Sequence, residues 1–251
     1  MRYKISFLKN RNMDAPIPLH HQHLIASSIE EIVRGLGFNE KFYTFSSLKG
    51  TSRINSGYIR FLSSKVTLAL ACRDKQFIES VVRRIFEQQG MMVGDLRLHP
   101  KTFEIIHDPE FKTKMKYVCI APIVLHPPRE GEEESNPEID VLSHEFSDLL
   151  YQSVMENMEK AGYTSAQLDS YAVFEATADQ EYVHKLNITG KKYARIYHNT
   201  QGLSMRGYLV PFSLHAHPDV HKFIWECGIG ILNNQGYGMV DIAQSSFPGG
   251  F

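Results

Sequence analysis

Three histidines stand close together near the start of the chain, at His20, His21 and His23. An imidazole has an unperturbed pKa of about 6.5, so it can take or give a proton near neutral pH. The segment 20–34 carries an apolar stripe at helical spacing, and at 100° per residue His21 falls on that stripe. We therefore predict that His21 packs in the core. His23, with His20 as second choice, points to the polar face and is the candidate general base, unless both are surface or helix-capping residues.

Lys41 is the candidate for a cation that stabilises negative charge on a substrate. Its position just before the strand-like segment 42–48 is equally typical of a solvated lysine at a strand end. A second group of histidines, at positions 215, 217 and 221, has the spacing of metal ligands. Because Pro218 predicts that a helix starts inside this group, a shared ligand face is not established. We expect neither a metal nor another cofactor.

Four glycines occupy one short stretch near the C-terminus, at Gly228, Gly230, Gly236 and Gly238. Glycine reaches positive φ and lacks Cβ, so backbone N–H groups can face outward and a large ligand can approach closely. Gly228 alone is an ordinary helix C-cap, but one cap does not require four glycines. The order is helix, glycines, strand, the reverse of a dinucleotide-binding loop. The stretch therefore indicates a different kind of ligand.

The elements that must position these residues form one pattern, which occurs twice. Periodicity and turn signals in the first half predict strands at 2–9, 42–48, 58–62, 65–72 and 91–106, with helices at 20–34 and 75–89. Asp74 is the expected N-cap of the second helix. The order β-α-β-β-α-β is that of the ferredoxin-like unit.

The second half repeats this order with longer insertions. We predict strands at 117–126, 171–176, 182–188, 208–214 and 239–243, with helices at 141–158 and 218–227. The first of these helices is expected to turn Leu142, Phe146, Leu149, Leu150 and Val154 inward. The sequence therefore predicts an α+β fold of two tandem ferredoxin-like, RRM-like domains, at 1–112 and 113–251.

Composition indicates a globular protein, with 43% apolar and 22% charged residues among 251. No segment approaches the length of a membrane span, and three widely spaced cysteines are typical of reduced thiols, so we expect a cytoplasmic protein. The net charge of −1 does not favour nucleic-acid binding by itself. A protein of this composition that binds nucleic acid must concentrate its positive charge on one part of its surface. The acidic run Glu130–Glu134 is expected to be a solvated loop. The tail 245–251 is expected to be loose.

Several segments in sequence order resemble one known family. They are the proline-led, histidine-rich Ile17–His23, the strand Lys41–Ser46, the small-Pro-Ile turn Ala121–Val124, and the glycine stretch followed by Met239 and Val240. These features are similar to the RAMP superfamily of CRISPR RNA-binding proteins, and within it to the endoribonucleases that cut CRISPR repeat transcripts into guide RNAs. The glycine stretch is the most specific of them.

The resemblance implies metal-independent RNA cleavage, in which the 2′-hydroxyl attacks the adjacent phosphorus and leaves a 2′,3′-cyclic phosphate and a 5′-hydroxyl. His23 or His20 would then act as the base and Lys41 as the cation. The glycine stretch would contact RNA through Gly228, Gly230, Asn233, Asn234, Gln235, Gly236 and Gly238. A basic group with interleaved Tyr193 and Tyr197 either follows the RNA backbone or is a solvated hairpin; its members are Lys185, Lys191, Lys192 and Arg195. Arg53 and Arg60 allow the same two interpretations.

The chain also departs from this family. Some members carry a tyrosine where the first helix here has Glu30, and a catalytic histidine in the following loop, where residues 35–40 contain none. The alternative is therefore a RAMP-type protein that binds RNA in a CRISPR complex without cleaving it. The expected partners are CRISPR repeat RNA, other subunits of an effector complex and a second copy of the chain.

Overall fold

The computed structural model describes residues 1–9, 15–130 and 137–243. Most of the acidic run and the whole tail 245–251 lie outside these ranges, so both expectations about them stay predictions. No helix in the described ranges is long and apolar enough to cross a membrane.

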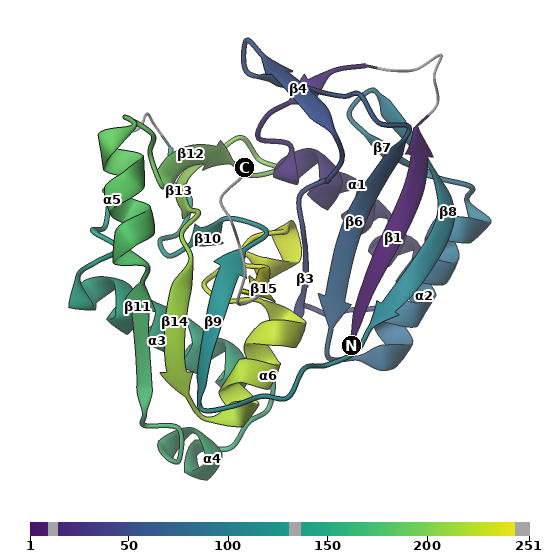
Figure 1. Cartoon of the computed structure of the whole chain (residues 1–251). Helices are drawn as coiled ribbons and strands as arrows, with labels where there is room; N and C mark the ends of the chain where they lie inside the picture. Colours follow the sequence, from purple (N-terminus) through teal and green to yellow (C-terminus); the bar gives the residue numbers. More distant parts are fainter. Residues whose placement is uncertain (10–14, 131–136, 244–251) are drawn as a thin grey trace.

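The first half builds one five-stranded antiparallel sheet with two helices (Figure 1). Its elements are β1 (Arg2–Lys9), β2 (Ile17–Pro18), α1 (Gln22–Leu36), β3 (Tyr43–Phe45), β4 (Ser52–Asn55), β5 (Tyr58–Phe61), β6 (Lys65–Cys72), α2 (Lys75–Glu87), β7 (Met91–Val93) and β8 (Leu96–Ile106). The strand order is β3-β6-β1-β8-β7. Strands β2, β5 and β4 form a separate small sheet.

The second half builds a four-stranded sheet in the order β11-β14-β9-β15, and β10, β13 and β12 form a separate three-stranded sheet. Its elements are β9 (Lys114–Cys119), β10 (Ile123–Val124), α3 (His144–Lys160), α4 (Ser165–Asp169), β11 (Phe174–Ala178), α5 (Gln180–Ile188), β12 (Ala194–His198), β13 (Ser204–Tyr208), β14 (Phe212–Ala216), α6 (Pro218–Cys227), the 3-10 turn η3 (Asn233–Gln235) and β15 (Val240–Ile242).

The two halves share one topology. If the four strands of each β-α-β-β-α-β unit are numbered along the chain, both sheets have the order 2-3-1-4. All of the recorded pairings in these two sheets are antiparallel, and β7 is an addition at the edge of the first. The structure confirms the predicted α+β fold of tandem ferredoxin-like units. The boundary at 112/113 stays a prediction; it falls in the connection between β8 and β9.

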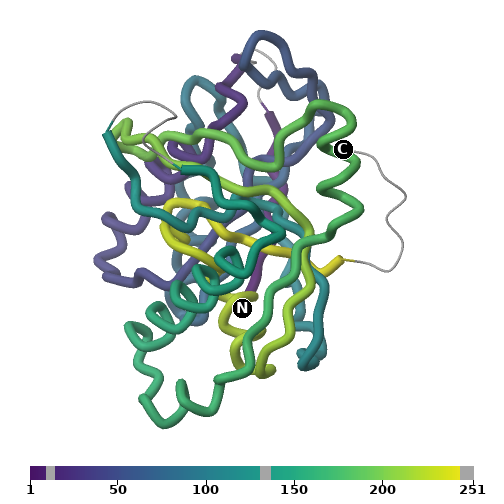
Figure 2. Tube along the Cα trace, turned by 90° about the vertical axis from the view of Figure 1, so that its left-hand side faces the viewer, coloured from purple at the N-terminus to yellow at the C-terminus, as the bar shows by residue number. Residues whose placement is uncertain are grey.

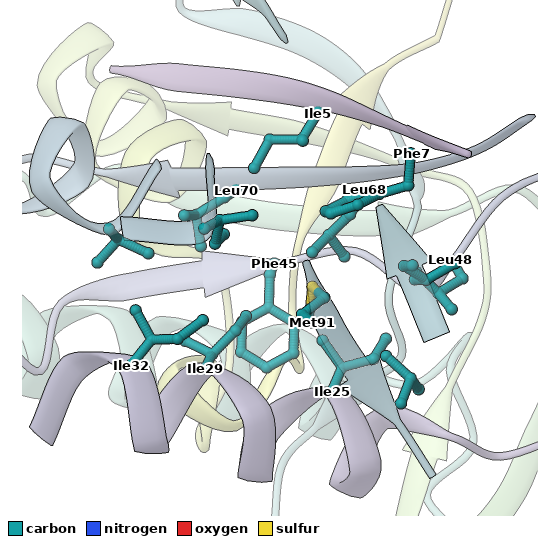
Figure 3. Packing of buried hydrophobic residues seen from close by; sticks show 14 of the residues in the cluster. Ile5, Phe7, Ile25, Ile29, Ile32, Phe45, Leu48, Leu68, Leu70 and Met91 are labelled. Atoms are coloured by element: carbon teal, nitrogen blue, oxygen red, sulfur yellow. The ribbon is translucent and has the colours of Figure 1, made fainter. Parts of the chain in front are cut away.

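Each half has its own hydrophobic core. In the first, Ile25, Ile29 and Ile32 of α1 point toward Phe45 of β3, as the helical spacing predicts (Figure 3). All four side chains are fully or almost fully buried. The predicted N-cap of α2 is also present, because the Asp74 carboxylate accepts a hydrogen bond from the Phe77 amide.

Two details of the second half differ from the sequence-based expectation. The predicted strand 182–188 is helix α5, because the Asp179 carboxylate caps the Tyr182 amide and starts a helix there. Leu142 was expected to point inward, but α3 begins only at His144 and the Leu142 side chain is 47% exposed.

The N-terminus fastens the two halves together. Arg2 is buried, and its guanidinium donates to the carbonyls of Trp225 and Val240, each at 2.9 Å. The guanidinium carbon lies 3.4 Å from the centre of the Trp225 ring. The terminal ammonium pairs with the Glu226 carboxylate at 2.8 Å. These contacts fix strand β1 of the first half against helix α6 of the second.

Candidate functional site

The histidine cluster lies at the start of α1, where its three members have different environments. His21 is buried, as predicted: its Nε2 accepts from the Leu48 amide at 3.2 Å, and its Nδ1 faces the Leu19 carbonyl at 3.1 Å. Burial lowers the pKa of His21 to about 4. The ring is therefore neutral at pH 7 and holds the entry of α1 to the segment after β3. His20 and His23 are only half-buried.

His20 and His23 face strand β12 of the second half. The His20 ring meets the Tyr197 ring edge-on, with 4.5 Å between ring centres. Arg195 and His198 lie close enough to His20 for their charges to lower its pKa. His198 lies close enough to His23 to do the same. The start of α1 and the β12–β13 segment run side by side at the top of both views (Figures 1 and 2). The two halves therefore contribute to one cluster of imidazoles beside a guanidinium.

The cluster favours neutral imidazoles. Partial burial lowers the pKa of His20, and the nearby charges of Arg195 and His198 lower it further. Burial, and then His198, lowers the pKa of His23, while a hydrogen bond to the His20 carbonyl partly opposes this. A neutral imidazole can accept a proton, and Arg195, which is exposed, can bind an anion.

Lys41 does not join this cluster. It follows the C-terminal end of α1, whereas His23 stands in the first turn of that helix. A helix of 15 residues is about 22 Å long, so the lysine and the imidazoles lie at opposite ends of it. The Lys41 side chain is exposed, and the neighbouring Phe42 packs toward Phe223 of α6. The predicted cation at Lys41 stays a prediction that the arrangement of the elements does not favour.

The glycine stretch is packed against protein on most of its length. All four glycines have φ between +70° and +89° and are buried. A Cβ at Gly236 would lie 2.1 Å from the Phe45 ring, and one at Gly230 would lie 2.5 Å from the Val124 carbonyl oxygen. The amides of Ile231 and Gly238 donate to the carbonyls of Val124 and Pro122. Close packing thus explains why these positions are glycine.

The same stretch joins the two halves. The Gln22 side chain of α1 donates to the Gly236 carbonyl, and the Thr44 hydroxyl of β3 donates to the Tyr237 carbonyl at 3.0 Å. Asn233 is buried and its side-chain amide donates to the carbonyls of Ile229 and Tyr237, so it holds the turn closed. Asn234 and Gln235 are half-buried. The Gln235 amide oxygen is itself buried, so Asn234 is the more accessible of the two, and the predicted RNA contacts of this stretch stay predictions.

The predicted basic group is divided by the fold. Lys185 lies on α5, Lys191 and Lys192 lie in the exposed connection to β12, and Arg195 lies on β12 beside His20. Sequence reasoning missed His198, which comes three residues after Arg195. No spacing links His198 to His20, and only the pairing of the halves brings them together.

The histidines with metal-ligand spacing serve other contacts. His221 is fully buried, and its Nδ1 lies 2.9 Å from the Tyr117 hydroxyl. His217 caps α6 by accepting from the Asp219 amide at 3.2 Å. Over the described ranges, the structure gathers no group of three or more His, Cys, Asp or Glu side chains suited to a metal ion.

Comparison with known proteins gives consistent matches. The family model described as CRISPR associated protein Cas6, C-terminal, matches residues 106–242. The CRISPR-associated endoribonuclease Cas6 1 of Methanocaldococcus jannaschii is 25% identical over 235 residues, which cover 89% of this chain and 86% of that protein.

Solved structures share the fold over almost the whole chain. One described as CRISPR associated protein Cas6 has a TM-score of 0.77 at 21% identity and covers 97% of this chain and 99% of its own. Another, described as a RAMP protein binding different RNA substrates, has a TM-score of 0.75 at 19% identity and covers 97% of this chain and 100% of its own. Both likenesses agree with the two tandem ferredoxin-like units.

Proposed function

The chain belongs to the Cas6 family of CRISPR-associated proteins, and from this premise we propose that it is an endoribonuclease that cleaves CRISPR repeat transcripts into guide RNAs. One observation carries the proposal. His20 and His23 from the first half lie beside Arg195 and His198 from the second, so imidazoles suited to proton transfer and a guanidinium suited to bind phosphate lie where the halves meet.

The reaction is a transesterification on the substrate's own ribose. A neutral imidazole takes the proton of the 2′-hydroxyl, and that oxygen bonds to the adjacent phosphorus. The bond from phosphorus to the 5′-oxygen breaks, and a protonated imidazole gives that oxygen a proton. The products are a 2′,3′-cyclic phosphate and a 5′-hydroxyl, without a water molecule or a metal ion.

We assign the base to His20. It lies close to Arg195, and the base must act beside the cation that holds the phosphate. The lowered pKa of His20 keeps its imidazole neutral and ready to accept a proton at neutral pH. His198 is close to both His20 and His23, and in its protonated form it gives its own proton to the leaving 5′-oxygen while His20 keeps the proton of the 2′-hydroxyl.

Arg195 supplies the charge that the phosphate needs. A guanidinium can donate two parallel hydrogen bonds to the phosphate oxygens, whose charge grows in the transition state. Its neighbour Tyr197 is buried and holds the His20 ring edge-on, so the base is oriented before RNA binds. Orientation of this kind contributes much of the rate in such reactions.

The test is cleavage of CRISPR repeat RNA in EDTA under single-turnover conditions. The variants His20→Ala, His23→Ala, His198→Ala and Arg195→Ala are compared with His184→Ala, an exposed histidine of α5 outside the cluster. We expect His20→Ala to slow cleavage by about 10²–10⁴-fold and His184→Ala to leave it unchanged. A 2′-deoxy nucleotide at the scissile position abolishes cleavage.

Two other results would decide against this proposal. Tight binding of repeat RNA without any product by the wild type favours the alternative of a RAMP protein that only binds RNA. Loss of activity in Lys41→Ala with full activity in Arg195→Ala would move the cation to Lys41. The predicted partnership with other effector-complex subunits, and the homodimer, are tested by the mass of the complexes that form on repeat RNA.

A further inference from the structure

The small sheet formed by β2, β5 and β4 is not part of either ferredoxin-like unit, and it projects at the top of the first half (Figure 1). Its hairpin turns at Ser56 and Gly57, which both have positive φ, as a two-residue hairpin turn requires. The register pairs Arg53 directly with Arg60, and Asn55 directly with Tyr58. These pairs therefore share one face of the hairpin.

That face is turned to solvent. Ile59 and Phe61 alternate with Tyr58 and Arg60 along β5, and both belong to the first hydrophobic core. Arg53, Arg60 and Tyr58 are exposed, and the Tyr58 side chain is 52% exposed. The outer face of the hairpin thus carries two adjacent guanidinium groups beside an exposed aromatic ring.

No described acidic side chain forms an ion pair with the two arginines of this face. Like charges directly opposite each other destabilise a sheet, and in the described parts of the chain neither Arg53 nor Arg60 has an ion pair. The sequence agrees, since residues 41–73 contain six Lys or Arg and no Asp or Glu. Arg53 and Arg60 are the two of these six that lie on the outer face of the hairpin, in a chain whose net charge is −1.

The hairpin is joined directly to the histidine cluster. The Leu19 amide donates to the Gly57 carbonyl at 2.8 Å, and Pro18 of β2 pairs with Tyr58. Leu19 immediately precedes His20, so the backbone of Tyr58 pairs with the segment that leads into the proposed base. Arg60 lies two residues, about 7 Å, further along β5.

We propose that the outer face of the β4–β5 hairpin binds a single-stranded segment of the RNA next to the cleaved nucleotide. Arg53 and Arg60 contact consecutive phosphates, and Tyr58 stacks on a base, as aromatic platforms do in single-strand binding proteins. The inference rests on the proposed function, because it takes the RNA in the histidine cluster as its starting point.

The test measures binding of fluorescein-labelled CRISPR repeat RNA, and of oligo(U), by fluorescence anisotropy over a range of salt concentrations. We expect Arg53→Ala/Arg60→Ala to weaken binding of the repeat RNA at least about tenfold. The slope of log affinity against log salt becomes shallower by about 1.4, or 0.7 for each lost phosphate contact. The control Arg83→Ala/Arg97→Ala removes the same charge from exposed positions on α2 and β8 and leaves both quantities unchanged.

A second set of variants separates contact from folding. Tyr58→Ala weakens binding at least about fivefold, whereas Tyr58→Phe, which keeps the ring, binds as the wild type does. Arg53→Lys/Arg60→Lys keeps the charge and restores the salt dependence. Thermal melting of each variant shows whether the hairpin remains folded.

Two outcomes would overturn the inference. If the wild type cleaves repeat RNA and Arg53→Ala/Arg60→Ala binds it with unchanged affinity and salt slope, the inference fails and the proposed function stands. If the wild type binds neither repeat RNA nor oligo(U), both fail together.

Discussion

Substitution of Gly236 by alanine tests the packing role of the glycine stretch. Gly236 has φ +84°, and an L-residue in the left-handed region costs about 1–2 kcal/mol. The new Cβ would lie 2.1, 2.6 and 2.7 Å from three atoms of the Phe45 ring, which is fully buried. Overpacking of this kind costs about 1–3 kcal/mol more. We therefore expect a loss of roughly 2–5 kcal/mol in the free energy of unfolding.

Gly202→Ala is the matched control, because Gly202 has φ +80° and nothing lies within 4 Å of its Cβ position. The free energy of unfolding of Gly202→Ala should fall only by the cost of the left-handed backbone conformation, about 1–2 kcal/mol. For a chain of this length each kcal/mol lowers the melting temperature by about 2–4 °C, so calorimetry should separate the two variants. Phe45→Leu should recover part of the Gly236→Ala loss, since the smaller side chain removes the clash. Equal melting temperatures for Gly236→Ala and Gly202→Ala would refute the reasoning.

Three further predictions concern charge and pH. Arg195→Ala should raise the pKa of His20, because it removes a positive charge that lowers this pKa. The acid limb of the pH–rate profile should therefore move to higher pH, and an unmoved limb would contradict the assignment of His20 as the base. Burial lowers the pKa of His21 to about 4, so between pH 6.5 and pH 4 the unfolded chain takes up a proton more readily than the folded one. The free energy of unfolding should therefore fall by about 3 kcal/mol over this range. Urea unfolding of His21→Gln should lack this pH dependence. Arg2→Ala should cost about 2–5 kcal/mol by leaving two carbonyls unpaired, whereas Lys4→Ala, which loses an exposed ion pair, should cost at most about 1 kcal/mol in the same assay.

The fold was predictable where one element's own pattern decides its environment. The stripe of Ile25, Ile29 and Ile32 defines the buried face of α1, and it correctly places His21 inside. The prediction of a strand at 182–188 was wrong, because a short run that contains aromatic and β-branched residues also fits one face of a helix. The signal that decides is Asp179, whose carboxylate caps the first turn of α5.

The site was only partly predictable, because it depends on contacts between distant parts of the chain. The local sequence places His20 and His23 on a polar face, but nothing in it pairs them with His198. The glycines likewise indicate a close approach without identifying what approaches. The structure supplies Phe45, which lies almost the whole chain away from Gly236.

A double-mutant cycle across the two halves tests the central claim most directly. Single-turnover cleavage of repeat RNA in EDTA is measured for the wild type, His20→Ala, Arg195→Ala and the double variant. If His20 and Arg195 act together in the same cleavage step, the double variant loses about as much rate as the more damaged single variant, because residues that act as a unit are not additive. Losses that multiply independently, or full activity in either single variant, would contradict the account.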